Sequence, residues 1–200
     1  MSTVDPRLVS ALRTQLARRG AAARVGWKVG RGDSERIGGS IAVGHLTAAT
    51  VVDPGGTYRD GGNDLHADAE VALELGTHRT IAGYRIALEI VDLETLANPE
   101  AIVEANIFHR AVAFGELSTR RPNHAHSALT INGEVRDTAK VDEDFDQTLE
   151  TVDRILAAVH EQLAPGDRII TGSIVQVPIE SGDDVAAEIE GLGRVELAVG

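Results

Sequence analysis

The alternation of polar and apolar residues is clearest over residues 66–75 (HADAEVALEL). Asp68, Glu70 and Glu74 fall on one face of this stretch, while valine and leucine side chains fall on the other. Successive side chains of a β-strand point to opposite faces, so the pattern predicts a strand with one buried face. A turn is predicted to follow it at residues 77–83.

A second alternating stretch follows at residues 84–91 (YRIALEIV). Isoleucine and leucine side chains occupy one of its faces, and Ala87, Glu89 and Val91 occupy the other. Glu89 is therefore a lone carboxylate between two small apolar neighbours on the second predicted strand.

Apolar residues at helical spacing predict three helices. Residues 5–19 have Asp5 in position to cap the first turn and Gly20 in position to end the helix. Residues 144–163 carry the longest stripe of leucine, valine and isoleucine, and a shorter helix is predicted at residues 95–106.

Shorter runs of β-forming residues complete the pattern, and a glycine-rich loop is expected at residues 31–40. Asn132-Gly133 is a turn signal within one of these runs. We therefore predict one β-rich α+β domain over residues 1–200, with residues 1–24 as an N-terminal helical segment. The remaining predicted strands span residues 25–30, 111–117, 128–136, 167–176, 184–189 and 193–199.

The composition fits a single cytoplasmic domain. Two hundred residues can bury most of their apolar surface, and aromatic residues make up only 3%, so the core must consist of aliphatic side chains. No apolar run reaches the length of a membrane span, and the polar first residues lack a signal-peptide profile. The chain contains no cysteine, which excludes disulfides and thiolate metal sites.

The formal net charge of −12 limits the classes of partner. A nucleic-acid-binding surface needs basic side chains against phosphate, so we expect no nucleic acid and no membrane among the partners. A requirement for a cation is compatible with the acidity. Strands with one apolar face in a short chain also favour a homo-oligomer that buries this face.

Carboxylates two residues apart on a strand lie side by side, with roughly 7 Å between their Cα atoms. Asp68 and Glu70 are in this position, and like charges so placed repel each other. A hard divalent cation between them would remove the repulsion. The alternative is a solvated strand face with surface ion pairs. For Glu74, an exposed charge at the edge of a strand is the better interpretation.

Several short motifs occur in a specific order along the chain. Together they resemble the fumarylacetoacetate hydrolase superfamily, and within it the 2-hydroxypenta-2,4-dienoate (2-keto-4-pentenoate) hydratases and the 4-oxalocrotonate decarboxylases. The specificity lies in their order and combination. The motifs are Gly26-Trp27-Lys28-Val29-Gly30, Asp68-x-Glu70, Ala87-Leu88-Glu89-Ile90-Val91-Asp92, Asn132-Gly133-Glu134, Gly166-Asp167-Arg168-Ile169-Ile170-Thr171-Gly172-Ser173, Gly182-Asp183-Asp184-Val185 and Gly191-Leu192-Gly193.

This resemblance implies a mixed β-roll with flanking helices, of the type formed by the C-terminal domain of the superfamily. It implies a magnesium or manganese ion held by Asp68, Glu70 and Glu89. It also places Lys28 beside the metal-bound substrate, where the lysine moves a proton, and lets Thr171-Gly172-Ser173 line the pocket for the substrate carboxylate. Ser173 is a candidate for catalysis as well as for binding.

Two of these candidates have ordinary alternatives. A lysine in apolar surroundings, such as Lys28 between Trp27 and Val29, can serve as a proton shuttle, but lysines also extend from strands to solvent. Ser173 follows a glycine and can donate a hydrogen bond to a carboxylate, or it can serve the turn alone. Three histidines are interpreted as surface or supporting residues, namely His66, His124 and His126.

The chain departs from the family pattern beside the expected pocket. Arg31 follows Gly30 where relatives commonly continue with Leu-Thr-Ser, and Ala105-Asn106 stands where relatives carry Asp-Asn. We expect Asn106 and Arg31 to contact the substrate. The basic side chains of Arg31, His109 or Arg110 could bind an additional anionic group. The segment between the second and third expected metal ligands is also short.

The predicted function is that of a metal-dependent hydratase, which acts on a small 2-hydroxydienoate or 2-oxo acid through a metal-stabilised enolate, as in the catabolism of aromatic compounds. Decarboxylation of a 4-oxalocrotonate or oxaloacetate type of 2-oxo acid uses the same enolate and is the first alternative. The second is hydrolysis of a C–C bond in an acylpyruvate, for which the sequence offers no convincingly placed His–Glu pair. The third is a shortened, non-catalytic homologue that binds an anion or a partner subunit.

Overall fold

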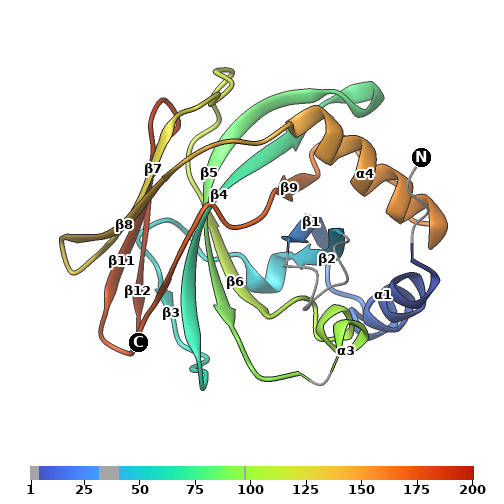
Figure 1. The fold of residues 1–200 in the computed structure, drawn as a ribbon, viewed down its shortest axis with the longest axis horizontal. Coiled ribbons are helices and arrows are strands. Elements are labelled where there is room, and N and C mark those ends of the chain that lie inside the picture. Colours follow the sequence, from blue (N-terminus) through green and yellow to red (C-terminus); the bar gives the residue numbers. More distant parts are fainter. Residues whose placement is uncertain (1–4, 32–40, 97) are drawn as a thin grey trace.

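The computed structural model of the chain describes residues 5–31, 41–96 and 98–200. Two β-sheets pack against each other, and the helices lie on the side of the larger sheet that faces away from the smaller one (Figure 1). The predicted α+β class is confirmed. The described helices are α1 (Pro6–Arg18), α3 (Pro99–Glu104) and α4 (Phe145–Ala158), with the short 3-10 helices η1 (Ala48–Thr50) and η2 (Thr77–Arg79). None of these helices is long and apolar enough to cross a membrane.

The larger sheet contains the seven strands β1 (Arg24–Arg31), β2 (Ile41–Thr47), β4 (Leu65–Leu75), β5 (Ile81–Asp92), β6 (His109–Phe114), β9 (Arg168–Ile170) and β10 (Val175–Pro178). Their order is β2-β1-β9-β4-β5-β6, and β10 also pairs with β4. The sheet is mixed, because β1 and β9 run parallel while the other pairs are antiparallel. It curls from the long β4–β5 hairpin towards β1 and β2 (Figure 1).

The smaller sheet contains the five strands β3 (Thr57–Tyr58), β7 (His126–Ile131), β8 (Glu134–Lys140), β11 (Asp184–Ile189) and β12 (Gly193–Val199). Their order is β3-β12-β11-β7-β8. The main hydrophobic core lies between the two sheets, where Val71 and Leu73 of β4 and Ile86 and Leu88 of β5 are fully buried. Leu129 of β7 meets them from the smaller sheet.

The strand predicted at residues 66–75 exists, but it is not half-buried. Every residue from Ala67 to Leu73 is buried, so both of its faces lie in the interior. The apolar face packs on the smaller sheet, while the face with Asp68 and Glu70 points into the concave side of the curled sheet. Alternation alone could not reveal this second buried face, because it arises when β1, β2 and the helices close over the strand.

Several predicted boundaries differ from the observed ones. Strand β2 was not predicted, and the run at residues 167–176 is divided into β9 and β10 by a turn at Gly172, whose φ of 108° ends the first strand. Arg31 belongs to β1, and the rest of the predicted loop lies outside the described residues. The predicted helix at residues 95–106 shortens to α3. The Asn132-Gly133 turn is confirmed as the link between β7 and β8.

Candidate metal centre

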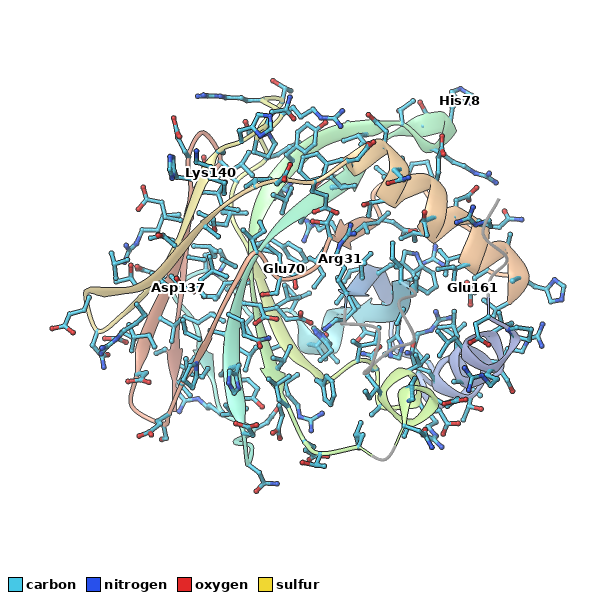
Figure 2. The ribbon with its side chains drawn as sticks, viewed as in Figure 1. Arg31, Glu70, His78, Asp137, Lys140 and Glu161 are labelled. Atoms are coloured by element: carbon cyan, nitrogen blue, oxygen red, sulfur yellow. The ribbon has the colours of Figure 1, made fainter. Side chains whose placement is uncertain are left out.

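Three carboxylates meet on the concave face of the β4–β5 hairpin. The antiparallel register places Asp68 directly opposite Glu89, and Glu70 lies two residues further along β4. One oxygen from each carboxylate lies within 4.8 Å of the others, and the three residues are at most 4% exposed. Figure 2 shows Glu70 in the interior of the molecule, whereas the labelled side chains His78 and Asp137 lie at its periphery.

The close approach of three buried carboxylates shifts their pKa values in opposite directions. Burial, followed by repulsion from Glu89, raises the pKa of Asp68 to about 7. The same two causes raise the pKa of Glu70 well above its usual range. Burial also acts to raise the pKa of Glu89, but the Lys28 ammonium and the hydrogen bond from His109 outweigh it and hold the pKa at about 2.

The protein donates hydrogen bonds to some oxygens of the three carboxylates and leaves others without a partner. Glu89 Oε1 lies 2.6 Å from both Lys28 Nζ and His109 Nδ1, and Glu70 Oε2 accepts a 2.8 Å hydrogen bond from the Gly172 amide. Glu89 Oε2 and Asp68 Oδ1 are buried and have no hydrogen-bond partner among the described residues. Buried anionic oxygens without partners are costly, and a divalent cation would satisfy them. The donor set therefore fits Mg²⁺ or Mn²⁺.

Lys28 reaches the cluster from β1. Its Nζ atom donates to Glu89 Oε1 and, over 2.9 Å, to the carbonyl oxygen of Ile107. Gly44 lies opposite Lys28 on β2, and a Cβ atom there would come within 2.8 Å of Lys28 Cγ. Lys28 is thus a buried ion-pair partner, 3% exposed, and not a lysine that extends to solvent.

A cavity of about 310 Å³ adjoins the carboxylates. Its polar lining consists of the three carboxylates, Lys28, Arg31, Ser173 and Gln176. Its large apolar lining residues are Val91, Leu93, Ile102, Ile107 and Phe108. An apolar cavity with a few convergent polar groups is the usual form of a small-molecule site.

Arg31 lies where this cavity meets a second one of about 410 Å³. Its Nε atom donates to the carbonyl oxygen of Thr171, and a terminal nitrogen contacts Glu143 and, over 2.7 Å, the hydroxyl of Thr148. The guanidinium is therefore already paired with one carboxylate. Its side chain is still 43% exposed.

The Thr171–Ser173 turn mainly supports the carboxylates. Thr171 is fully buried and does not line the cavity, and Gly172 contributes its amide to Glu70. Ser173 does line the cavity, and it lies close enough to Asp68 to act to lower the pKa of that carboxyl.

Asn106 lies away from the cavity lining. Its side-chain oxygen accepts from the His45 amide over 2.8 Å, and its side-chain nitrogen donates to the His45 carbonyl over 3.0 Å. Both polar ends of Asn106 are thus occupied by the backbone of β2. The structure does not bring Asn106 together with the other expected substrate-binding residues.

Glu74 lies outside the carboxylate cluster, but it is not simply an exposed edge charge. Its Oε2 atom lies 2.6 Å from Arg85 Nε and 3.6 Å from Arg168 Nε, and its side chain is 21% exposed. His66 contacts Asp64 at the start of β4 and lies outside the cluster. His124 and His126 are both exposed.

Two residues lie next to the carboxylates in roles that the sequence did not predict, since His109 was considered only as a possible partner of an anionic group and Gln176 was not considered. His109 forms a buried pair with Glu89, but it does not line the cavity, so the expectation that no His–Glu pair is placed to activate water for C–C hydrolysis stays a prediction. Gln176 lies opposite Asp68 on β10, and its side chain acts to lower the pKa of that carboxyl. Both placements depend on pairing between strands. The only local signal was the unusual Ile107–Arg110 segment around the histidine.

Solved structures of low sequence identity share this fold. The magnesium and adipate complex of 4-oxalocrotonate decarboxylase from Pseudomonas putida G7 aligns with a TM-score of 0.82 and 18% identity, over 96% of this chain and 86% of the other. Fumarylpyruvate hydrolase from Pseudomonas aeruginosa, in complex with Mn²⁺ and pyruvate, gives 0.64 and 20%, over 88% and 89%. The 2-hydroxyhepta-2,4-diene-1,7-dioate isomerase from Mycobacterium marinum gives 0.62 and 20%, over 89% and 76%.

The sequence comparison identifies the family directly. No curated protein matches the chain. The family model described as fumarylacetoacetate (FAA) hydrolase C-terminal matches residues 46–200, which include β4, β5 and all three clustered carboxylates. The match covers more than half of the sequence, and the fold agrees with it. The chain therefore belongs to the fumarylacetoacetate hydrolase family.

Proposed function

We propose that the protein is a metal-dependent lyase that forms the enolate of a small 2-oxo acid. The observation that carries this proposal is the buried cluster of Asp68, Glu70 and Glu89 beside Lys28, in the lining of a cavity of about 310 Å³. Two relatives of the same fold support it, since one was solved with magnesium and another with Mn²⁺ and pyruvate, which is itself a 2-oxo acid.

In this proposal the three carboxylates hold Mg²⁺ or Mn²⁺, which supplies a Lewis acid for the 2-oxo group when it is bound. Lys28 is the residue that transfers a proton to or from the substrate, because it lines the cavity and its Nζ atom lies next to Glu89. Ser173 and Gln176 lie beside Asp68 and line the space for the substrate carboxylate. Arg31 is available at the edge of the cavity for a second anionic group.

Hydration of a 2-hydroxydienoate is the first candidate reaction. The dienol loses its hydroxyl proton as a proton adds to the terminal carbon C5, and water then adds across C3 and C4, with its hydroxyl on C4 and its proton on C3, so that one molecule of water is consumed and a 4-hydroxy-2-oxo acid forms. Lys28 is the donor that this scheme requires next to the substrate. The order of the family motifs along the chain supports this reaction.

Decarboxylation is the second candidate, favoured by the apolar residues that share the cavity lining with the carboxylates and form an apolar wall there. A substrate carboxylate against this wall would leave as neutral CO₂, its bonding electron pair would enter the enolate, and Lys28 would return a proton to carbon. Loss of a charge is favoured where the charged group is poorly solvated. Hydration and decarboxylation use the same residues in every step that leads to the enolate.

Glu89→Gln tests the proposal, with Glu74→Gln as the matched control on the same hairpin. We expect wild-type protein and E74Q to bind Mg²⁺ or Mn²⁺ in calorimetry, and E89Q to lose at least tenfold in affinity, because the amide cannot supply the anionic oxygen. We also expect wild-type protein to convert either 2-hydroxypenta-2,4-dienoate or a dicarboxylic 2-oxo acid, with loss of turnover in E89Q.

The products separate the candidates, since hydration releases no CO₂. Metal binding without turnover of either substrate would favour a non-catalytic homologue that binds an anion or a partner subunit. Absence of metal binding by the wild-type protein, or full activity of E89Q, would contradict the proposal.

A further inference from the structure

We propose that His109 is a positioning residue for the metal centre, which fixes Glu89 so that one of its carboxylate oxygens stays free for the ion. This inference rests on the proposed metal site. It concerns a residue on β6, a strand that contributes none of the three clustered carboxylates.

The two oxygens of Glu89 have different surroundings. Oε1 is held at 2.6 Å by His109 Nδ1 from one side and at 2.6 Å by Lys28 Nζ from the other. Oε2 is buried and has no hydrogen-bond partner among the described residues. Two donors on a single oxygen restrict rotation of the carboxylate and leave the other oxygen free for an ion shared with Asp68 and Glu70.

His109 is itself held from behind. Its Nε2 atom lies 2.9 Å from the hydroxyl of Thr50, and this hydroxyl lies 3.1 Å from the carbonyl oxygen of Thr47. The ring therefore connects the η1 segment to Glu89 through one nitrogen on each side. Fixing a ring at both nitrogens defines its orientation, as a partner beyond the ligand does in metal sites generally.

His109 does not contact the substrate space. Its side chain is 1% exposed, and it is absent from the lining of the cavity next to the carboxylates. A direct part in proton transfer to a substrate would require access to the cavity. The geometry thus assigns His109 to the support of Glu89 and leaves Lys28 as the residue that is exposed to the cavity.

Two substitutions of His109 separate this role from general packing. The side-chain nitrogen of asparagine takes the position of histidine Nδ1, so this variant can keep the hydrogen bond to Glu89. The side-chain nitrogen of glutamine takes the position of histidine Nε2, so this variant keeps the contact with Thr50 and loses the one with Glu89. Both variants bury an amide in the same position, so their difference reports the Glu89 contact.

The measurement is the dissociation constant of Mn²⁺ for wild-type protein, His109→Asn and His109→Gln, determined by calorimetry well below the unfolding temperature. We expect H109Q to bind Mn²⁺ about 10- to 100-fold more weakly than wild-type protein, as is typical when a residue behind a metal ligand is lost. H109N should keep most of the affinity. His45→Gln, which changes a histidine that does not contact Glu89, should bind Mn²⁺ like wild-type protein.

Equal Mn²⁺ affinities of folded H109Q, H109N and wild-type protein would overturn the inference and leave the proposed function intact. Failure of wild-type protein to bind Mn²⁺ would instead overturn the proposed function on which the inference rests. Thr50→Val extends the test if either His109 variant does not fold, because it removes only the hydroxyl behind the ring. We expect T50V to weaken Mn²⁺ binding less than the loss of the Glu89 contact, and an unchanged affinity would contradict the inference.

Discussion

At the scale of single residues, the pKa values of the three clustered carboxylates are shifted in opposite directions. Glu89 is kept ionised by Lys28 and His109, whereas burial and repulsion favour protonation of Asp68 and Glu70. Such a division is typical of functional sites, since a purely structural interior gains nothing from three adjacent carboxylates. The metal-free protein is therefore expected to carry protons that an ion must displace.

This leads to a prediction about pH. The pKa of Asp68 is raised from 3.8 to about 7, so below pH 7 a bound cation must release the proton of Asp68, and above it this proton is already gone. Affinity for Mg²⁺ should therefore rise with pH through about 7, the range in which Asp68 loses its proton. Calorimetry in buffers of different ionisation enthalpy measures the protons released. Asp68→Asn should release fewer protons, and a proton count of zero at pH 6 would contradict the prediction.

The same shift has a consequence for the stability of the metal-free fold. Because Asp68 binds its proton more tightly in the folded chain than in the unfolded one, this group favours folding most below about pH 4. The contribution of Asp68 to the free energy of unfolding is lost as the pH rises towards about 7 and the buried carboxyl ionises. A bound cation would stabilise the ionised carboxylate, so Mg²⁺ should raise the free energy of unfolding more at pH 8 than at pH 5.

At the scale of elements, the alternating pattern correctly predicted β4 and β5, because both are long and carry regular apolar residues on one face. Their pairing register, which places Asp68 opposite Glu89, required the antiparallel hairpin as a whole. Strand β2 was missed because Gly44 and His45 interrupt its apolar residues. The contact of Gln176 with Asp68 joins strands that are distant in the sequence, and the contact of His109 with Glu89 depends on the pairing of β5 with β6, so neither follows from local pattern.

The junction between β1 and β9 gives a prediction about stability. A Cβ atom at Gly26, where φ is 157°, would lie 1.9 Å from the carbonyl oxygen of Arg168 on β9. Gly26→Ala must therefore separate the two strands, and we expect a loss of about 3 kcal/mol or more in the free energy of unfolding. Urea denaturation measures this loss.

Gly55→Ala is the matched control, because Gly55 also has a positive φ but a Cβ atom there would meet nothing within 4 Å. Only backbone strain of about 1–2 kcal/mol is expected for this variant. Equal stabilities of G26A and G55A would show that the close approach of β1 and β9 does not restrict position 26.

At the scale of the whole molecule, the curled sheet turns a strand with alternating residues into one that is buried on both sides. One side meets the smaller sheet (Figure 1), and the other carries the buried carboxylates that line the cavity. This closure is a property of the complete fold. It explains why the pattern of β4 predicted a half-buried strand, and why the solvated-face alternative for Asp68 and Glu70 is wrong.

The homo-oligomer expected from the sequence stays a prediction. The apolar face that suggested it is covered within the chain by the smaller sheet. Val135 on the edge strand β8 is the more plausible contact, because it is a large apolar side chain that is 63% exposed. Light scattering should give a mass of at least two chains for wild-type protein and a lower mass for Val135→Lys. A single-chain mass for wild-type protein would contradict the prediction.

The central claim is that Asp68, Glu70 and Glu89 hold a divalent cation. The most direct measurement is anomalous diffraction from crystals grown with Mn²⁺, collected on wild-type protein and on Glu70→Gln. We predict a peak between the three carboxylates at Mn²⁺ distances, which in hard-cation sites are about 2.0–2.2 Å from oxygen, and its loss or strong reduction in E70Q. A wild-type map without a peak at this position under saturating Mn²⁺ would contradict the account.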